Sequence, residues 1–129
     1  RLVVAHPDGT GNLAEARGYM VGGKTGTSEK VRPEGGYFKD RNIASFVATF
    51  PVHEPKYVLA IMVDDPKGQK KSYYKTTGGW VAAPAAKEII RHAAPMLGIL
   101  PVDEKAPEIR QKLWLDFKIG KGEMALASY

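Results

Sequence analysis

In the segment Val21–Val31, VGGKTGTSEKV, Lys24 and two threonines lie among or beside three glycines. Read from Gly18, GYMVGGKT satisfies the phosphate-loop pattern G-x-x-x-x-G-K-[ST], which would make the chain a nucleotide binder. A second pattern, Lys-Thr-Gly followed by Thr, belongs to acyl-transfer sites. The two patterns require different structure on either side of Lys24, so the flanking residues can distinguish them.

The flanking residues do not suit a phosphate loop. Such a loop needs a strand before its first glycine and a helix that starts at Lys-Ser/Thr, because the phosphates bind the free N–H groups of that helix. Here Asn-Leu-Ala-Glu-Ala-Arg precedes Gly18, and Gly26, Arg32–Pro33 and Gly35–Gly36 would break a helix after Lys24. The sequence therefore disfavours nucleotide binding.

A β-strand through Lys24 has different consequences. The two-residue period places Thr25 and Thr27 on one face, where their hydroxyls could hold a carboxylate. Gly26 leaves room for a substrate backbone, and the N–H of Thr27 is available to an oxyanion. Lys24 lies on the opposite face, so its stem must curl round the strand edge. An edge strand with a surface lysine and two β-forming threonines fits the same residues, so both interpretations stay open here.

Composition sets broad limits on the fold and the function. The chain has 129 residues, 43% hydrophobic and 26% charged, which predicts one globular domain. Without cysteine it has no disulfides or thiolate metal sites, but its compartment stays open. The opening RLVVAHPDGTG has no initiator methionine and no signal-peptide pattern, so we expect a piece of a longer chain. The net charge of +5 is a weak indication of an anionic partner.

Short apolar runs predict the elements around Lys24. We expect the end of a helix at Leu2–Ala5 and a strand at Tyr19–Val31. Two buried strands are predicted at Ile43–Phe50 and Tyr57–Val63, because both are rich in β-branched and aromatic residues. The connector at 51–56 is too short for a parallel crossover, so these two strands should form an antiparallel hairpin.

A helix is predicted over Val81–Leu97, with Pro84 in its first turn and Gly98 after its end. Pro95 should kink or fray its last turn. The residues from Pro101 onward mix proline with charge, and we expect them to form an extended C-terminal arm with a weakly apolar stretch at Leu113–Ile119. The apolar face of the helix is expected to carry Ala85, Ile89, Ala93 and Met96.

The order of several motifs resembles that of one protein family. These motifs are Gly9-Thr10-Gly11, Gly18-Tyr19, Gly23-Lys24-Thr25-Gly26-Thr27, Lys30-Val31, Gly36-Tyr37, Ile43 to Val47, Phe50-Pro51, Val63-Asp64, Pro66-Lys67-Gly68 and Ala82-Ala83-Pro84. Together they are similar to the C-terminal part of class B penicillin-binding proteins, in particular the division-specific peptidoglycan D,D-transpeptidases. The resemblance covers residues 1–98, and its agreement in spacing is more specific than Lys-Thr-Gly alone.

The resemblance implies an α+β fold of the penicillin-binding, β-lactamase-like type, an antiparallel β-sheet flanked by helices. Residues 1–98 would be its C-terminal part, supplying the last three of five strands and the final helix, and residues 99–129 a C-terminal extension. The family also carries S-x-x-K, with the nucleophilic serine and its base lysine, and S-x-N. Both are expected upstream of this chain, which should therefore be inactive alone.

The resemblance also implies roles for single residues. Lys24 matches the lysine that interacts with the S-x-N serine and supports proton transfer. Thr25 and Thr27, with Gly26 between them, match the residues that hold the carboxylate of a donor peptide or a β-lactam, and the Thr27 N–H matches the second oxyanion-hole donor. The sequence gives weaker support for a role of two loop aromatics, Tyr73 and Tyr74. They could wall the substrate cleft or be plain surface residues.

The implied function is a two-step acyl transfer that cross-links peptidoglycan stem peptides during septal cell-wall synthesis and is blocked by β-lactam antibiotics. The expected partners are the stem peptide, the rest of the transpeptidase domain and divisome proteins, at the periplasmic face of the inner membrane with the anchor outside this chain. No metal, cofactor or nucleic acid is expected. A homo-oligomer is expected if the strand Tyr57–Val63 is left unpaired.

A function of a different class also fits the basic surface. The loop at 67–75 is rich in lysine and could belong to a non-catalytic module that binds nucleic acid or an anionic wall polymer. Ser72 and Lys75 in this loop satisfy S-x-x-K, but nothing there holds a base rigidly beside the serine. The Asp64–Asp65 pair lies at a strand end without metal-ligand spacing. The three histidines are isolated and are expected to be turn or surface residues: His6, His53 and His92.

Overall fold

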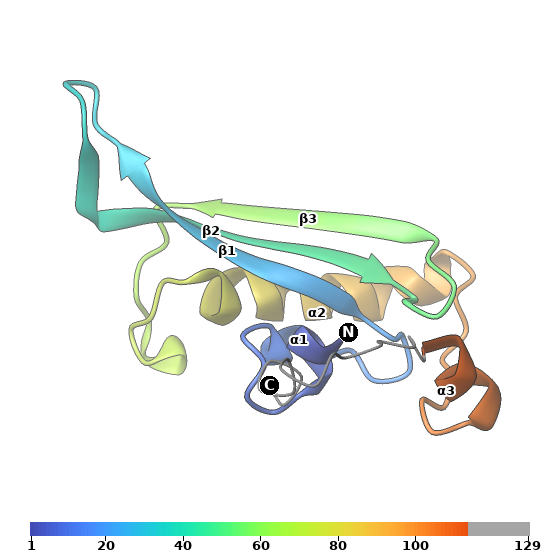
Figure 1. Ribbon diagram of the computed structural model, residues 1–129. Helices are drawn as coiled ribbons and strands as arrows, with labels where there is room; N and C mark the ends of the chain where they lie inside the picture. The colour runs from blue at the N-terminus through green and yellow to red at the C-terminus, as the bar shows by residue number, and fades with distance from the viewer. Residues whose placement is uncertain (114–129) are drawn as a thin grey trace, which may run out of the picture.

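The computed structural model describes residues 1–113 (Figure 1). In chain order the elements are α1 (Leu2–Ala5), the 3-10 helix η1 (Asn12–Ala14), β1 (Gly22–Val31), β2 (Tyr37–Phe50), β3 (Tyr57–Asp64), the 3-10 helix η2 (Lys70–Ser72), α2 (Gly78–Met96) and α3 (Pro107–Leu113). The strands form one antiparallel sheet in the order β1-β2-β3, and α1 and α2 lie on the same face of it. The predicted α+β architecture and the β2–β3 hairpin are confirmed.

Alternation along β2 divides the sheet into a covered and an open face. Phe46 is completely buried against α2, whereas its neighbour Val47 is 49% exposed on the other side. Side chains on the covered face of β2 pack with those of α1, η1 and α2 in one hydrophobic core. This core sits on one side of the sheet, and its buried residues from β2 and α2 are Phe46, Ala48, Phe50, Ala82, Ala83, Ala86, Ile90 and Ala94.

α2 differs from the sequence prediction in its start and in its buried face. It begins at Gly78 rather than Val81, so Pro84 lies inside the helix and not in its first turn. The predicted apolar face is wrong, because Ile89 is 45% and Met96 is 86% exposed. Small alanines face the sheet instead, since the phenylalanines of β2 already fill the space there and a close approach needs small side chains. Pro95 also lies inside the helix, near its end.

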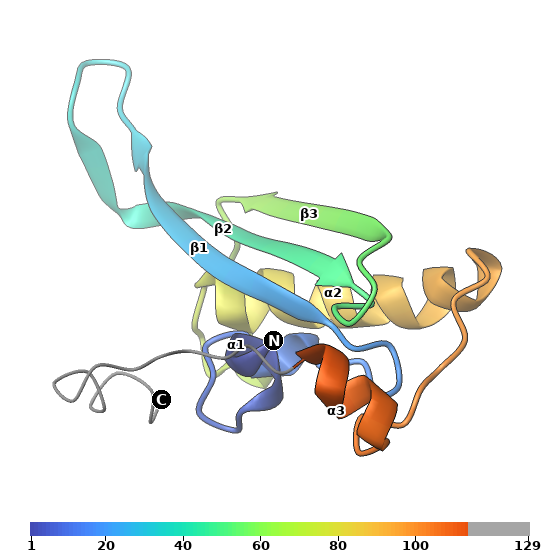
Figure 2. The ribbon, with the colours of Figure 1, turned by 45° about the vertical axis from the view of Figure 1, so that its right-hand side comes forward.

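β1 and β2 are bounded differently from the prediction. β1 begins at Gly22 rather than Tyr19, because Gly18 and Met20 have positive φ values of 87° and 48° and form a turn. β2 begins well before Ile43, so β1 and β2 continue as a two-stranded ribbon that projects past β3 (Figures 1 and 2). The predicted loop at 32–36 is the tip of this ribbon.

Ion pairs fasten the ribbon to the end of β3. Lys30 of β1 pairs with Asp64 at 2.7 Å, and Arg41 of β2 pairs with Asp65 at 2.9 Å. Hydrogen bonds from Lys67 and Arg41 hold the pKa of the Asp65 carboxyl below its ordinary value. The carboxylate pair at the strand end therefore has a structural use.

The segment after α2 folds back onto the domain. Ile99 is buried in the core, and the N–H of Val102 donates to the Gly18 carbonyl at 2.9 Å. The extended arm predicted from Pro101 is wrong over the described residues, because α3 forms there with Pro107 at its first position and Ile109 buried. Most of the apolar stretch predicted at 113–119 lies outside the described residues.

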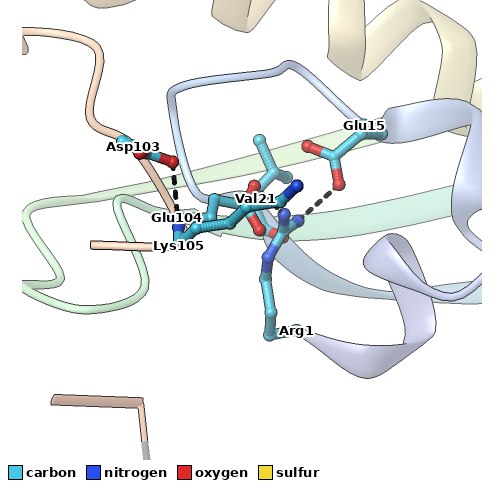
Figure 3. Close-up of polar contacts among 6 residues, drawn as sticks. All are labelled: Arg1, Glu15, Val21, Asp103, Glu104 and Lys105. Carbon is cyan, nitrogen blue, oxygen red and sulfur yellow. Dashed lines mark hydrogen bonds and ion pairs between the residues drawn. The ribbon is translucent and has the colours of Figure 1, made fainter. Parts of the chain in front are cut away.

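Arg1 ties this returning segment to the rest of the domain (Figure 3). Its guanidinium donates to Glu15 at 2.6 Å and to the Val21 carbonyl at 2.7 Å, and it also pairs with Glu104. Burial opposes the charge of Arg1, but the hydrogen bonds with Glu104 and Glu15 outweigh it and raise the pKa of the guanidinium. The cluster joins residues on both sides of the predicted boundary at 98 and 99.

Candidate functional site

The Lys-Thr-Gly-Thr segment lies in β1, the outermost strand of the sheet on the side away from β3. Thr25 is opposite Phe46 of β2, so Thr25 and, two residues on, Thr27 lie on the face covered by α2. Lys24 pairs with Val47 and lies on the open face. No helix begins at Lys24, which removes the structural requirement of a phosphate loop.

The ammonium of Lys24 nevertheless reaches the edge of its own strand. Its Nζ donates to the Thr25 carbonyl at 2.9 Å. In an antiparallel strand the N–H and C=O of one residue point to the same side, and residues two apart repeat this direction. The N–H of Thr27 therefore points to the same edge as the Thr25 carbonyl. The Lys24 ammonium and the Thr27 N–H therefore lie at the same edge of β1.

The two threonine hydroxyls are each held by one partner. Thr27 Oγ1 accepts a hydrogen bond from the Gly78 N–H at 3.0 Å. The Thr25 hydroxyl donates to Thr10 Oγ1 at 3.2 Å. Because hydroxyl hydrogens rotate, this bond can reverse so that Thr25 accepts from Thr10. A hydroxyl that accepts one bond keeps its own hydrogen for another acceptor. Because Thr27 is exposed and Thr25 is half-buried, both can donate to a carboxylate placed beside them.

The first turn of α2 packs directly on the strand pair beneath it. A Cβ on Gly78 would contact the carbonyls of Ser45 and Gly26, the latter at 2.5 Å, so only glycine allows this approach. The approach brings the positive end of a 19-residue helix beside Thr27. The electrostatics around the threonines therefore favour an anion.

Tyr73 and Tyr74 lie in the loop that connects β3 to α2. Both side chains are exposed, and both backbones are left-handed, with φ values of 49° and 60°. Tyr73 packs edge-on against Trp80 at 5.6 Å between ring centroids. Asn42 of β2 donates to the Thr76 carbonyl at 3.1 Å and holds the end of the loop beside the sheet. The loop thus enters α2 next to Gly78, the residue that contacts Thr27.

Ser72, which satisfies S-x-x-K together with Lys75, uses its hydroxyl for hydrogen bonds within its own turn. Its hydroxyl donates to the Gln69 carbonyl at 3.0 Å and accepts from the Gln69 N–H at 3.3 Å. The Lys75 ammonium lies over the Trp80 ring, 4.8 Å from its centre. A serine that caps its own turn, with the lysine turned to an aromatic ring, is not arranged as a nucleophile with its base.

Sequence reasoning missed three residues that the structure adds to this site. Thr10 contacts Thr25, Gly78 contacts Thr27, and Asn42 holds the loop before α2. Thr10 and Gly78 each lie among glycines, in Gly9-Thr10-Gly11 and in Thr77-Gly78-Gly79. These short glycine-containing patterns are the sequence signal that could have identified Thr10 and Gly78. Within residues 1–113, no group of three His, Cys, Asp or Glu side chains is placed to hold a metal ion.

Comparison with known families accounts for this arrangement. The family described as the penicillin binding protein transpeptidase domain matches residues 1–91. The chain belongs to this family. The matched range contains Thr10, Lys24, Thr27 and Gly78, and the resemblance to class B penicillin-binding proteins is confirmed.

Named relatives agree with the family match. The probable peptidoglycan D,D-transpeptidase FtsI of Caulobacter vibrioides is 46% identical over 102 residues, which are 75% of this chain and 17% of the relative. Stage V sporulation protein D of Bacillus subtilis is 40% identical over 112 residues, which are 86% of this chain and 16% of the relative. The chain thus spans less than a fifth of the length of either relative.

Solved structures of the family share the fold. The transpeptidase domain of penicillin-binding protein 3 from Burkholderia pseudomallei has a TM-score of 0.63 and 35% identity, over 78% of this chain and 28% of that one. Penicillin-binding protein 3 of Mycobacterium tuberculosis, in complex with ampicillin, has a TM-score of 0.65 and 27% identity, over 82% of this chain and 23% of that one. None of the helices described here has the length and apolar character needed to cross a membrane.

Proposed function

We propose that this chain is part of a peptidoglycan D,D-transpeptidase that cross-links stem peptides and is acylated by β-lactams. The observation that carries the proposal is the edge of β1, where Lys24 and the hydroxyls of Thr25 and Thr27 come from opposite faces of one strand. The family match over residues 1–91 supports the same function. The nucleophilic serine and its base lysine belong to residues outside this chain.

The proposed reaction has two steps. The serine hydroxyl oxygen attacks the carbonyl carbon between two D-alanines of a donor stem peptide, the C–N bond breaks, and D-alanine leaves with the proton that the serine released. The amine of a neighbouring stem peptide then attacks the serine ester, forms a new amide and returns a proton to the serine oxygen. A β-lactam acylates the same serine in the first step, and its ring opening leaves no amine free to depart.

Four polar groups of this chain act in the first step. The Thr27 N–H donates to the developing oxyanion, and the hydroxyls of Thr25 and Thr27 hold the terminal carboxylate of the donor. The ammonium of Lys24 supports proton transfer at the edge of β1. Gly26 lets the donor backbone lie alongside the strand, and Tyr73 and Tyr74 wall the cleft from the loop before α2.

The rest of the transpeptidase domain is the partner that this chain needs first. Val58 and Met62 of β3 are 73% and 75% exposed on the open face of the sheet, and Val47 lies between them and Lys24. We assign this face and the outer edge of β3 to the upstream part of the domain. The assembled enzyme works on the periplasmic face of the inner membrane, anchored by a segment outside this chain, in septal synthesis with divisome proteins.

Labelling of the full-length protein with a fluorescent penicillin tests the proposal. We expect one covalent label, mapped by mass spectrometry to a serine of an S-x-x-K motif outside this chain. A Ser72→Ala variant is the matched control and should be labelled as strongly as the parent. Absence of any covalent label would refute the transpeptidase and favour a non-catalytic module that binds an anionic polymer through its lysine-rich loop.

A further inference from the structure

The Gly9-Thr10-Gly11 turn is one of the family motifs that have no role in the function proposed above. Its threonine hydroxyl lies 3.2 Å from the Thr25 hydroxyl, although the two residues come from different segments of the chain. We propose that Thr10 is a positioning residue for the donor carboxylate and that it acts through the Thr25 hydroxyl. This inference rests on the proposed transpeptidase function and assigns one more residue to its carboxylate site.

The packing around the turn fixes the position of Thr10. A Cβ on Gly9 would overlap the Val3 carbonyl of α1, and a Cβ on Gly11 would lie 2.9 Å from the Phe46 ring of β2. The Gly11 N–H also donates to that Val3 carbonyl at 3.1 Å. Both glycines therefore let the turn pass between α1 and the sheet, where a larger residue would displace it.

The first turn of α2 closes the other side of Thr10. A Cβ on Gly79 would overlap the Thr10 carbonyl and would lie 3.7 Å from the Thr25 methyl group. The backbone of Thr10 is thus held against α1, β2 and α2 while its side chain remains exposed to solvent. A rigid backbone with an accessible hydroxyl is what a positioning residue requires.

The hydrogen bonding gives the two carboxylate-binding threonines equivalent support. The Thr27 hydroxyl accepts from the Gly78 N–H, and the Thr25 hydroxyl donates to Thr10 Oγ1, a bond whose direction can reverse. A hydroxyl hydrogen rotates to suit its partners, so a bound carboxylate takes the hydrogen of Thr25 and Thr10 then donates to Thr25. Thr10 thereby orients the Thr25 hydroxyl toward the ligand.

Acylation kinetics of the full-length transpeptidase test this role. The probes are a penicillin and its methyl ester, which lacks the negative charge that Thr25 holds. We expect Thr10→Val to raise the half-saturating concentration of the penicillin roughly three- to tenfold, with little change in the limiting acylation rate. Thr10→Ser should restore the parent value, and the methyl ester should react equally with parent and variant. Thr49→Val, on another part of the sheet, is the matched control.

A double-mutant cycle shows whether Thr10 acts through Thr25. The variant with both Thr10→Val and Thr25→Val should bind penicillin no more weakly than Thr25→Val alone. Additive losses, or a Thr10→Ser variant that behaves like Thr10→Val, would overturn the proposal. Equal losses with penicillin and ester in both Thr10→Val and Thr10→Ala would indicate a general folding role and would also overturn it. A parent protein that takes no label refutes the transpeptidase itself, whereas a labelled parent with an unaffected Thr10→Val variant refutes only the role of Thr10.

Discussion

The ammonium of Lys24 bends back onto its own strand, where it donates to the Thr25 carbonyl. A compact ammonium on a flexible stem can make this turn, but a planar guanidinium cannot occupy the same point. We therefore predict that Lys24→Arg in the full-length protein lowers the limiting rate of penicillin acylation by roughly 10²-fold, the low end of the usual contribution of proton transfer. This limiting rate can be measured by stopped-flow acylation kinetics. Lys39→Arg on the ribbon is the matched control, and a fully active Lys24→Arg variant would exclude the proton-transfer role.

Thr27 has both a main-chain N–H and a side-chain hydroxyl at the site. A side-chain substitution can separate the roles of these two groups. Thr27→Val keeps the N–H but removes the hydroxyl, and it leaves the Gly78 N–H without its acceptor. We predict an approximately tenfold rise in the half-saturating penicillin concentration. The limiting rate should fall by less than the roughly 10²–10³-fold that follows loss of an oxyanion donor.

Thr27→Ser is the control for this prediction and should bind penicillin like the parent, because it retains the hydroxyl. The combined variant Thr25→Val and Thr27→Val should be the weakest binder of the series. If that combined variant were acylated at the parent rate and affinity, these hydroxyls would have no part in binding the carboxylate.

For these residues the sequence predicts which face of the strand each side chain occupies, but not its hydrogen-bond partners. The two-residue period of a strand was enough to separate Lys24 from Thr25 and Thr27. The partners of the threonines were out of reach, because Thr10 precedes Thr25 by 15 residues and Gly78 follows Thr27 by 51. Contacts at such separations depend on how α1 and α2 pack on the sheet, and no local pattern encodes that packing.

At the scale of elements, the start of α2 is the most constrained contact near the site. Gly78→Ala would drive a methyl group into the carbonyls of Ser45 and Gly26, which belong to paired strands and cannot move aside. We predict a loss of about 1–3 kcal/mol in the free energy of unfolding, measured by denaturant titration of the full-length domain. The shift should also displace the N–H that holds Thr27 and weaken penicillin binding.

The control for this prediction is the neighbouring residue Thr77. It is exposed, stands at the N-cap of α2 and makes no capping hydrogen bond through its side chain. Thr77→Ala should therefore unfold at nearly the parent denaturant concentration. An equally stable Gly78→Ala variant would show that α2 can withdraw from β1 without loss, contrary to the packing described here.

Strands were easier to predict than helices in this chain, for a physical reason. Runs of β-branched and aromatic residues mark β2 and β3 directly. The buried face of α2 is made of alanines, so the larger and more exposed Ile89 and Met96 misled the assignment of its apolar side. α3 is short and polar, and its one buried apolar residue, Ile109, gives little local signal. Tertiary contacts decide both features.

Taken as a whole, the described residues form a three-stranded sheet that is covered on one face. One face has a core with α1, η1 and α2, and the Arg1 cluster fastens the returning C-terminal segment to it. The opposite face carries Val47, Val58 and Met62 with little cover. A domain of this size has little stability to spare, so such a face needs a partner.

Over its described residues, the chain taken alone has an unpaired edge on its sheet. Within residues 1–113 no strand pairs with the outer edge of β3, whose residues Tyr57–Val63 are almost all apolar. An unpaired apolar edge beside an uncovered face recruits another chain. We predict that the isolated chain forms a dimer or a larger oligomer through β3, measured by sedimentation at micromolar concentration. Met62→Lys should shift it toward monomer, whereas Lys39→Glu on the ribbon should not. A folded monomer with slow amide exchange along 57–63 would contradict this prediction, because a bare edge exchanges its outward N–H groups freely.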